Sequence, residues 1–558
     1  MLSLESRGQY ATLLDAETLR ADDDRPAIVY VASDRPPVTV SRRAFAATTA
    51  AYANSLHEVG LRPRDLVVIA HTQNLESIYA FWGALRLGAI PSMFPTLTEK
   101  LDPDVYMGSM AELARLSGVA AVLTTDEFAP ALRLRLPCPV YGSAELHHDA
   151  PAAGHPQPPD PGEIAFLQHS SGTTGLQKGV ALSHAAVLNQ VAAYSDTLSL
   201  RESDVVVSWL PLYHDMGLIA GFLLPLLQGL PLVLMSPFDW VQHPALLFRA
   251  IHDYRATLCW LPNFAYNHCA RRVRRRDSEG LSAASMRLFV NCSEPVRHDS
   301  HTQFLERFAA NGVRADMLGV SYAMAENTFA VTQTPPGRPA RLDSIDGQEL
   351  VTSGYAKPLP PADPTAQRRV SCGPPIPGTR LRVLDDDGRP LDDRHVGQLA
   401  IHSDCLLTGY YRRPDLQPFA PDGWFLTGDR GYVAEGEVYV IGRSKDLIIN
   451  AGKNIYPADI EAIVNQVPGV HAGRAVAFGV ADEREGTELI AVVAETRAAS
   501  GDERAVIARA IRAAVTHSAA VTVTYVHLVG PRWLLKTSSG KIARAANREK
   551  WRRETREG

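Results

Sequence analysis

The clearest chemical signal in the sequence is a short segment rich in glycine and hydroxyl side chains around a single lysine. It reads SSGTTGLQKGV, from Ser170 to Val180, and directly follows the apolar run AFLQH. Glycines let successive backbone N–H groups point at one anion, and the hydroxyl groups add further donors. Lys178 supplies a point charge suited to phosphate. Leu176 and Gln177 intervene before the lysine, so the segment predicts a phosphate-binding loop that is not a Walker A loop.

Lysine is scarce in this chain, which makes the position of each lysine informative. Only eight of the 56 Lys and Arg residues are lysine, and five of the eight lie in three glycine-rich segments. These five are Lys178, Lys445, Lys453, Lys536 and Lys541. An ammonium group is a compact charge that approaches carboxylates and phosphates differently from the planar guanidinium of arginine. The clustering favours anion chemistry at these segments over a scattering of surface lysines.

Strand-like and helix-like segments alternate from Arg64 onward and would have to position these groups. Leu66–Ala70 is apolar on both faces and Ala165–Ser170 is strand-like, whereas Leu75–Leu87 and Ala185–Ser195 have helical periodicity. Strands without a polar face are typical of parallel sheets that helices cover on both sides. The alternation therefore predicts an α/β fold.

A change of texture divides the chain into two predicted domains. Proline and glycine are frequent between Pro335 and Pro377, and short alternating strands follow. We expect an α/β multidomain protein in which residues 1–442 form two helix-covered sheets plus a small antiparallel β subdomain. Residues 443–446 would be a hinge, and residues 447–558 a small mobile α+β domain.

Composition and charge exclude several functional classes. Hydrophobic residues make up 46% and charged residues 21% of the chain, as in ordinary globular proteins. A formal net charge of -5 offers no basic field for nucleic acid or a membrane surface. Six cysteines without a C-x-x-C pair indicate neither a disulfide framework nor a zinc knuckle, and they favour a reducing compartment. The N-terminal residues lack the pattern of a secretory signal, so we expect a cytoplasmic protein.

One uncharged stretch, from Gly217 to Met235, has the length of a membrane span. Pro225, Gly229 and Pro231 interrupt it, and such breaks would leave backbone groups unpaired in lipid. The stretch instead predicts a buried helix, a turn and a strand.

Five blocks in a fixed order resemble those of the adenylate-forming superfamily of acyl-CoA synthetases, fatty acyl-AMP ligases, luciferases and peptide-synthetase adenylation domains. They are SSGTTGLQKG, YAMAEN from Tyr322, GWFLTGD from Gly423, GRSKD from Gly442 and KTSSGKIAR from Lys536. The segments WLPLYHDMGLIAG, PNFAYNHC and NCSEPVR are most similar to the stand-alone fatty acyl-AMP ligases. The resemblance extends from about residue 25 to about residue 548.

The resemblance implies a ligase that joins a carboxylate to the α-phosphorus of ATP and releases pyrophosphate. Thr174 and Glu326 would position Mg²⁺, a hard cation suited to oxygen ligands. Asp429 would accept the ribose hydroxyls. The implied ATP-binding residues are Ser170, Ser171, Gly172, Thr173, Thr174, Gly175, Lys178, Ser293, Glu294, Pro295, Ser321, Tyr322, Asp429, Arg443 and Lys541.

The resemblance also implies roles for residues around the acid. Lys541 would bridge the carboxylate and the α-phosphate, and Lys445 would be the hinge between two domain poses. His214 would orient the acid, since a carboxylic acid is ionised at pH 7 and needs no base; a simple core histidine is the alternative. The expected acyl-pocket residues are His214, Trp260, Asn263, Phe264, Cys292, Ala323 and Met324.

Departures from the family pattern bear on the size of the acid. Ala323 stands in place of the usual Gly, Cys292-Ser293 in place of Gly-Ala, and Trp260-Leu261 where relatives often have small residues. Each change adds side-chain volume near the expected acyl tunnel, and overfilling a channel is unfavourable. The sequence therefore predicts a short, medium or ring-bearing acid rather than a long straight chain.

The acceptor of the acyl group is left open by the sequence. The favoured acceptor is the phosphopantetheine thiol of an acyl carrier protein, in natural-product or lipid biosynthesis, because Pro335–Arg369 falls where acyl-AMP ligases carry an insertion thought to restrain the C-terminal domain. Free CoA, an amine or another nitrogen nucleophile, and a non-catalytic nucleotide-binding scaffold are the alternatives. We expect a monomer or weak homodimer without nucleic-acid partners or stable membrane insertion.

Overall fold

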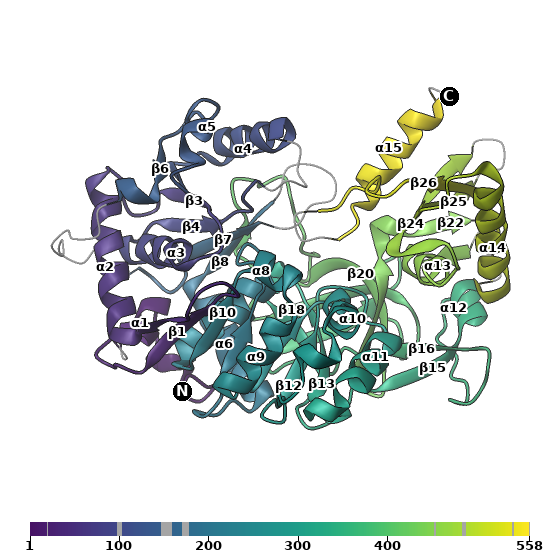
Figure 1. Ribbon diagram of the computed structural model, residues 1–558, viewed down its shortest axis with the longest axis horizontal. Helices are drawn as coiled ribbons and strands as arrows, with labels where there is room; N and C mark the ends of the chain where they lie inside the picture. Colours follow the sequence, from purple (N-terminus) through teal and green to yellow (C-terminus); the bar gives the residue numbers. More distant parts are fainter. Residues whose placement is uncertain are drawn as a thin grey trace.

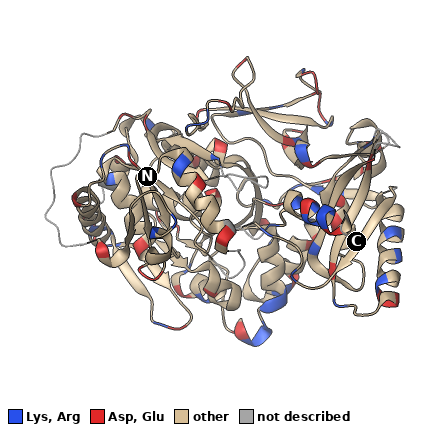
Figure 2. Ribbon diagram, turned by 90° about the horizontal axis from the view of Figure 1, so that it is seen from above, with Lys and Arg blue, Asp and Glu red and all other residues tan. Residues whose placement is uncertain are grey.

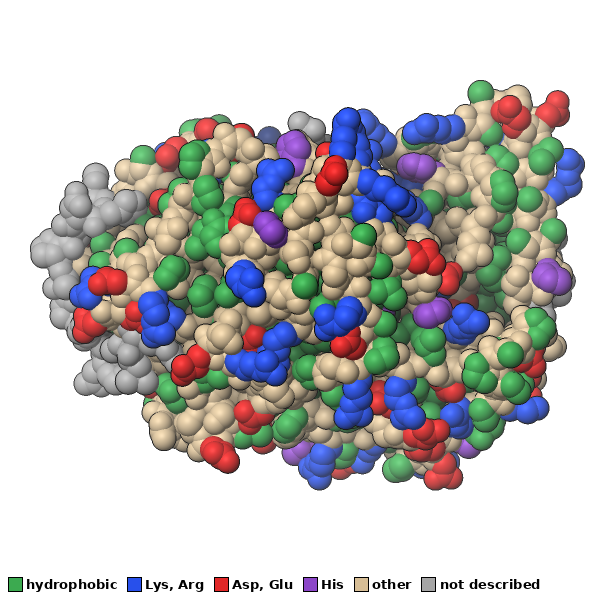
Figure 3. All heavy atoms as spheres, turned by 60° about the horizontal axis from the view of Figure 1, so that its bottom comes forward, with side chains coloured by type: hydrophobic (Ala, Val, Ile, Leu, Met, Phe, Trp, Pro, Cys, Tyr) green, Lys and Arg blue, Asp and Glu red, His purple; other side chains and the backbone are tan. Residues whose placement is uncertain are grey.

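Two large sheets that share one apolar core form most of residues 26–333 in the computed structural model (Figure 1). The structure describes residues 1–18, 21–97, 103–146, 159–169, 178–450, 453–482, 487–519, 521–537 and 541–556. Acidic and basic residues are interspersed along the ribbon (Figure 2), and the face in Figure 3 carries hydrophobic side chains dispersed among charged ones.

The larger sheet has eight strands in the order β14-β13-β12-β11-β9-β10-β1-β2. Its inner strands run parallel, and the edge strands β14 and β2 pair antiparallel to their neighbours. The strands are β1 (Pro26–Val31), β2 (Val38–Ser41), β9 (Val206–Ser208), β10 (Leu232–Met235), β11 (Leu258–Leu261), β12 (Leu288–Asn291), β13 (Leu318–Ala323) and β14 (Ala330–Gln333).

The second sheet has seven strands in the order β19-β8-β7-β4-β3-β5-β6. Strands β7, β4, β3, β5 and β6 are parallel, whereas β8 and β19 are added antiparallel at one edge. The strands are β3 (Leu66–Ala70), β4 (Ile90–Met93), β5 (Ala121–Thr124), β6 (Val140–Gly142), β7 (Ile164–His169), β8 (Gly179–Ser183) and β19 (Gly409–Tyr410).

Alternation along β3 explains why its sequence is apolar throughout. Val67 and Ile69 belong to the core shared by the two sheets, whereas Leu66 and Val68 belong to a second cluster on the other face. Successive side chains of a strand point to opposite faces, so a strand covered on both faces needs no polar residue. Helices α2, α3 and α6 contribute to the shared core, and α4 and α5 cover the outer face. The expected helix-covered sheets are confirmed.

Among the helices at these sheets, α3 matches the predicted segment Leu75–Leu87 and α6 lies close to the predicted segment Ala185–Ser195. The helices are α1 (Leu13–Thr18), α2 (Arg42–Glu58), α3 (Leu75–Leu87), α4 (Pro103–Ser117), α5 (Ala129–Arg133), α6 (His184–Leu198), α7 (Leu224–Gln228), α8 (Pro237–Gln242), α9 (Ala245–Tyr254), α10 (Asn263–Arg272) and α11 (His298–Phe308).

The apolar stretch after Asp215 differs from the expected α-helix in its winding. Residues Met216–Leu223 form a π-helix, η3, before α7 begins. A Cβ on Gly217 would lie 2.2 Å from the Pro211 carbonyl oxygen, so glycine permits this close approach. π-Helical turns are rare and occur frequently at functional sites. Among the described residues, no helix has the length and apolar character needed to cross a bilayer.

A four-stranded antiparallel sheet in the order β17-β18-β20-β21 follows, as expected for the small subdomain. A hairpin of two strands with helix α12 precedes it, within the region rich in proline and glycine. The elements are β15 (Leu342–Asp346), α12 (Gly347–Ser353), β16 (Ala366–Val370), β17 (Thr379–Leu384), β18 (Gly397–Ser403), β20 (Phe425–Ala434) and β21 (Glu437–Arg443).

Residues after the turn Ser444–Asp446 build further sheets around cores of their own. Their elements are β22 (Ile448–Asn450), β23 (Lys453–Ile455), α13 (Pro457–Val464), β24 (Val470–Asp482), β25 (Thr487–Thr496), α14 (Gly501–Ala519), β26 (Val523–Val529) and α15 (Arg544–Arg556). These separate cores are compatible with a division at residues 443–446, which stays a prediction.

Candidate active site

The candidate residues follow the carboxyl ends of neighbouring parallel strands in the eight-stranded sheet. His214 follows β9, Asn263 follows β11, Ser293 follows β12, and Tyr322 lies near the end of β13. The carboxyl ends of parallel strands meet at one edge of a sheet, where ligands commonly bind. The topology therefore gathers residues that are far apart in the sequence.

Tyr322, Asp429 and Arg443 form a polar cluster beside this edge. The Tyr322 hydroxyl donates a 2.7 Å hydrogen bond to Asp429 Oδ2, and Arg443 Nε lies 3.3 Å from Asp429 Oδ1. Asp429 and Arg443 face each other in the β20–β21 pairing. Burial raises the pKa of Asp429, while Arg443 and the Tyr322 hydroxyl oppose the rise. A carboxylate held in this way can accept hydrogen bonds from a pair of vicinal hydroxyls.

Glu326, Tyr410 and Lys178 form a second polar cluster. The Tyr410 hydroxyl donates a 3.1 Å hydrogen bond to Glu326 Oε1, and Lys178 Nζ lies 4.9 Å from the centroid of the Tyr410 ring. Burial of the carboxyl raises the pKa of Glu326. Glu326 thus offers oxygen ligands close to a cation, in a place where phosphates would be stabilised.

The chemistry of Glu326 fits the expected Mg²⁺. Among the described residues, no group of three or more His, Cys, Asp or Glu is arranged to hold a metal. Mg²⁺ usually takes one or two protein carboxylates and completes its shell with water and substrate phosphates, so a single glutamate suffices. Thr174, the other expected ligand, lies outside the described residues.

His214 and Asp215 lie at the start of η3. Asp215 Oδ1 accepts a 2.8 Å hydrogen bond from the Met216 N–H and lies 3.7 Å from His214 Nδ1. Burial alone would raise the pKa of Asp215, but His214, Lys541 and the Met216 N–H hold it below its ordinary value. An ionised Asp215 therefore gives the His214 ring a fixed partner, and a role for His214 in orienting the acid stays a prediction.

Lys541 brings a charge from the C-terminal part of the chain to this edge. Its carbonyl oxygen accepts a 2.7 Å hydrogen bond from the Thr537 N–H, which ties the two ends of its loop together. The positive charge of Lys541 lowers the pKa of Asp215, Cys292 and Asp429. These three residues belong to the N-terminal sheets and subdomain, so the ammonium lies close to the polar clusters described above.

Lys445 adds a further cation. Partial desolvation lowers the pKa of Lys445, and the charges of Arg443 and Lys178 act in the same direction. The side chain of the expected hinge residue therefore lies within electrostatic reach of the Lys178 and Asp429 clusters. The positive groups near Asp215, Glu326 and Asp429 form an electrostatic field suited to a polyanion.

Several residues expected at the nucleotide have partners within the protein. Glu294 Oε2 accepts a 2.9 Å hydrogen bond from the Phe264 N–H, and the Ser321 hydroxyl donates to the Thr332 carbonyl at 2.7 Å. Ser293 has a φ of 70°, a left-handed conformation that is uncommon for a non-glycine residue. Pro295 is exposed. Their contacts with ATP stay predictions.

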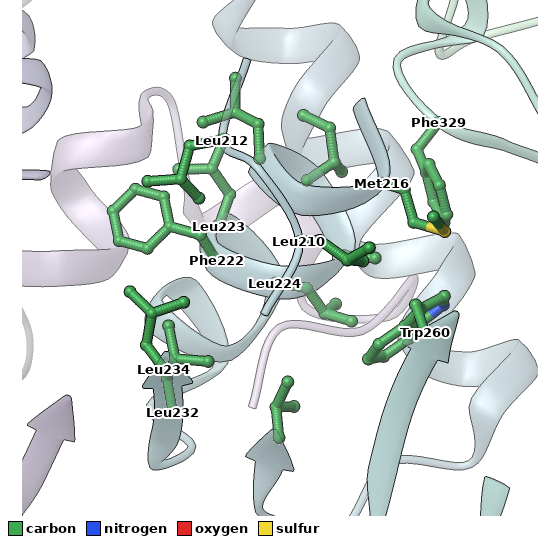
Figure 4. Packing of buried hydrophobic residues seen from close by; sticks show 14 of the residues in the cluster. Leu210, Leu212, Met216, Phe222, Leu223, Leu224, Leu232, Leu234, Trp260 and Phe329 are labelled. Atoms are coloured by element: carbon green, nitrogen blue, oxygen red, sulfur yellow. The ribbon is translucent and has the colours of Figure 1, made fainter. Parts of the chain in front are cut away.

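Trp260 is held inside the apolar core by a chain of hydrogen bonds. Its Nε1 donates to the Tyr194 hydroxyl at 2.9 Å, and that hydroxyl donates to Gln333 Oε1 at 2.7 Å. The indole is 1% exposed. Figure 4 shows Met216 and Phe329 beside it. This side chain has a fixed position, so its volume cannot easily be moved aside.

The other expected acyl-pocket residues divide into inner and outer positions. Cys292 is buried, whereas Ala323 and Met324 are half-buried and pack against the same core. Asn263 Oδ1 accepts hydrogen bonds from the Asn291 side chain and the Arg297 N–H, both at 3.1 Å. Phe264 is 39% exposed and lies edge-on to Trp209 and Trp240. The path of an acyl chain past these residues stays a prediction.

Most of the expected phosphate loop lies outside the described residues. Lys178 is the first described residue after the gap, and the expected ligands outside the described residues are Ser170, Ser171, Gly172, Thr173, Thr174 and Gly175.

Two side chains at the site were not expected from the sequence. Asp215 directly precedes a helix, a position where aspartate is favoured, so its capping role could have been found. Tyr410 lies in TGYYRRPD, where nothing in the local sequence distinguishes it from Tyr411. Only the pairing of β19 with β8 brings Tyr410 to Lys178.

Comparison with known proteins adds an independent line of information. Residues 16–411 match the family model of the AMP-binding enzymes. A Caulobacter vibrioides protein provisionally named an acyl-CoA synthetase is 32% identical over 502 residues, with 88% of this chain and 87% of the relative covered. A long-chain-fatty-acid–AMP ligase of Mycobacterium tuberculosis is 31% identical over 523 residues, covering 88% of each chain.

Solved structures of similar overall shape include fatty acyl-adenylate ligases. A structure from work on these ligases of E. coli and L. pneumophila matches with a TM-score of 0.89 and 29% identity, over 98% of both chains. The L. pneumophila fatty acyl-adenylate ligase in complex with acyl adenylate and pyrophosphate matches with a TM-score of 0.77 and 27% identity, over 99% of this chain and 98% of that chain.

Proposed function

Since the chain belongs to the AMP-binding enzyme family, we propose that this adenylate-forming ligase activates a short, medium or ring-bearing carboxylic acid and passes it to a carrier-protein thiol. In the first half-reaction a carboxylate oxygen attacks the α-phosphorus of ATP, an O–P bond forms, and the bond to pyrophosphate breaks. In the second, the thiol sulfur attacks the acyl carbon and AMP leaves with the electron pair of the broken bond.

The observation that carries the first half-reaction is the position of Lys541. Its charge acts on Asp215, which follows β9 of the large sheet, and on Asp429, which lies in β20 of the four-stranded sheet. An ammonium group between the acid and the nucleotide would offset the repulsion of two anions and stabilise the charge that develops at the α-phosphate.

The remaining polar residues would divide the nucleotide between them. Asp429 would accept the ribose hydroxyls, and Tyr322 would hold that carboxylate in place through its 2.7 Å hydrogen bond. Lys178 would bind the outer phosphates. Mg²⁺, when bound, would neutralise phosphate charge, with Glu326 as its protein ligand. His214 would orient the acid without removing a proton.

Pyrophosphate release across a panel of aliphatic and aromatic acids tests the adenylation step. We expect release that depends on both ATP and acid, together with a hydroxamate when hydroxylamine traps the adenylate. Lys357→Ala, which changes an exposed lysine, is the matched control for Lys541→Ala. Acid-independent release would contradict the proposal, whereas no release with any acid would contradict it and favour the non-catalytic scaffold.

The choice of a carrier protein over free CoA is supported by contacts of the hairpin β15–α12–β16. Arg369 in β16 forms two 2.8 Å hydrogen bonds with the carboxylate of Asp459 in α13. Burial alone would raise the pKa of Asp459, but Arg369 and Arg297 lower it. Val351 of α12 packs against the core of the C-terminal sheets. These contacts would restrain the C-terminal sheets against the rotation that acyl transfer to free CoA demands.

Free CoA remains the second candidate, favoured by the name of the Caulobacter relative. Incubation of the enzyme with ATP and a good acid, together with either free CoA or a phosphopantetheinylated carrier protein, separates the two. Acylated carrier with little acyl-CoA is the expected result. Efficient acyl-CoA formation would overturn the carrier assignment and leave adenylation intact, whereas transfer to an amine would identify a nitrogen acceptor.

A further inference from the structure

A short strap, residues Leu407–Tyr411, connects the exit of the expected phosphate loop with Glu326. The Tyr411 N–H donates to the Gly179 carbonyl at 2.8 Å, and the Thr408 N–H donates to the Ala181 carbonyl at 2.9 Å. At its other end the Leu407 N–H donates to the Glu326 carbonyl at 2.8 Å. The strap is therefore fixed by backbone hydrogen bonds to both sides of the expected triphosphate site.

Tyr410 lies in the middle of this strap and contacts a group on each side. Its hydroxyl donates to Glu326 Oε1 at 3.1 Å, and its ring lies 4.9 Å from Lys178 Nζ. Tyr410 is opposite Val180 in the β19–β8 pairing, which fixes the ring next to the loop lysine. Two groups of opposite charge thus share one neutral side chain.

We propose that Tyr410 is a positioning residue that holds Lys178 and Glu326 apart, in place for the phosphates and their cation. The proposal rests on the nucleotide roles proposed above for Lys178 and Glu326. A lysine and a glutamate that are free to meet would form an ion pair, which the incoming nucleotide would have to break. The aromatic face stabilises the ammonium without a counter-charge, because the ring presents its negative quadrupole to a cation. The hydroxyl fixes the orientation of the carboxylate by a hydrogen bond to Oε1 that is kept when a metal ion binds.

The two contacts can be removed one at a time. Tyr410→Phe retains the ring over Lys178 and removes the hydroxyl at Glu326, whereas Tyr410→Leu removes both. Tyr411→Phe is the matched control, because Tyr411 lies on the same strap and packs against the outer core instead. All three variants are compared with the wild type by thermal unfolding before any kinetic measurement.

Pyrophosphate release is measured against Mg²⁺ and ATP concentration. Loss of a hydrogen bond to an ionised group weakens binding by roughly tenfold. Tyr410→Phe should therefore raise the half-saturating Mg²⁺ concentration by about that factor, with little change in kcat at saturation. Tyr410→Leu should also raise the KM for ATP by roughly threefold, as expected for a lost cation–π contact.

Calorimetric titration with a non-hydrolysable ATP analogue, with and without Mg²⁺, gives a readout independent of turnover. We expect the Mg²⁺-dependent gain in affinity to shrink in Tyr410→Phe and to stay unchanged in Tyr411→Phe. The proposal is wrong if Tyr410→Phe and Tyr411→Phe change the Mg²⁺-dependent gain in affinity equally. It is also wrong if Tyr410→Phe lowers the unfolding temperature while the Mg²⁺ dependence is unaltered. Failure of all variants and the wild type to bind the analogue would instead contradict the nucleotide site itself. The Tyr410→Phe measurement decides the matter even if Tyr410→Leu does not fold.

Discussion

The Tyr322 hydroxyl donates a 2.7 Å hydrogen bond to Oδ2 of Asp429, although 107 positions separate the two residues in the chain. Asp429 is buried, and burial raises its pKa. The tyrosine therefore stabilises the ionised form of a carboxylate that the protein interior disfavours. Arg443 Nε lies 3.3 Å from the other carboxylate oxygen, Oδ1, and supports the ionised form as well.

Asp429→Asn should weaken ATP binding strongly while preserving shape. Hydrogen bonds to a charged acceptor contribute about 1.5–3 kcal/mol each, so the KM for ATP should rise roughly tenfold to a hundredfold. Tyr322→Phe should have a smaller effect, since it removes only the support of the carboxylate. Pyrophosphate release at varied ATP concentration measures both. An unchanged KM in Asp429→Asn would exclude a ribose contact.

Glu326→Gln should separate stability from activity. Burial raises the pKa of Glu326, so its carboxylate is less favourable in the folded than in the unfolded chain at neutral pH. Removing the charge should therefore stabilise the protein without ligand at pH 7.5, and in a chain of this length a gain of about 1 kcal/mol raises the unfolding midpoint by about 1 °C. Mg²⁺-dependent pyrophosphate release should fall at the same time.

The sign of this stability difference fixes its pH dependence. An acid whose pKa is raised by folding loses stability as the pH rises through its ordinary value of 4.5 and above. The advantage of Glu326→Gln should thus shrink as the pH falls toward 4.5. Thermal unfolding at several pH values measures it, and an advantage that grows in acid would contradict the burial argument.

Lys541→Ala should abolish adenylation and preserve the fold. Removal of a donor aimed at transition-state charge costs about 2.7–4 kcal/mol, or roughly a hundredfold to a thousandfold in kcat. Lys357→Ala is the control, since it removes a lysine that is exposed and lies outside the site. A rate within about threefold of wild type, smaller than the effect of one such donor, would rule out the catalytic assignment of Lys541.

Lys445→Pro should impair acyl transfer more than adenylation. A proline ring fixes φ and would stiffen the turn Ser444–Asp446, where the two halves of the chain connect. Lys445→Ala is needed beside it, because the Lys445 charge also acts near Lys178 and Asp429. Single-turnover transfer from preformed acyl-adenylate measures the second step alone. Equal loss of both steps in the proline variant would argue against a hinge.

Trp260→Gly should shift the preferred acid toward longer chains. Each added methylene in apolar contact contributes about 0.8 kcal/mol, so opening the space of an indole should improve kcat/KM for decanoate over octanoate, which differ by two methylenes, by up to roughly fifteenfold. The same change leaves a cavity that typically costs about 3–5 kcal/mol of stability. Tyr194→Phe provides the control: it removes the indole's hydrogen-bond partner and retains the indole itself.

The measurement is a ratio of kcat/KM values for acids of increasing length, which does not depend on the fraction of folded enzyme. If the wild type turns over palmitate faster than octanoate and benzoate, the volume argument fails and the acyl chain must follow another path.

The sequence by itself determined the class of fold and the order of the chemical blocks. Leu66–Ala70 and Leu75–Leu87 were identified to the residue, because a doubly covered strand and an amphipathic helix impose periodicities that local sequence carries. The lysines also stood out locally, since an ammonium among glycines needs no tertiary information to be recognised. The π-helix after Asp215 was not foreseen, because it depends on the close approach of Gly217 to Pro211.

Only the tertiary structure decided which groups meet. Tyr410 reaches Lys178 through a strand pairing between segments more than 200 positions apart. Trp260 in strand β11 is fixed by a hydrogen bond to Tyr194 of helix α6. Arg369 of β16 and Asp459 of α13 likewise form hydrogen bonds although 90 positions separate them. Such contacts leave no trace in local periodicity, because each depends on two distant segments whose relative position is set by sheet order and by the packing of a shared core.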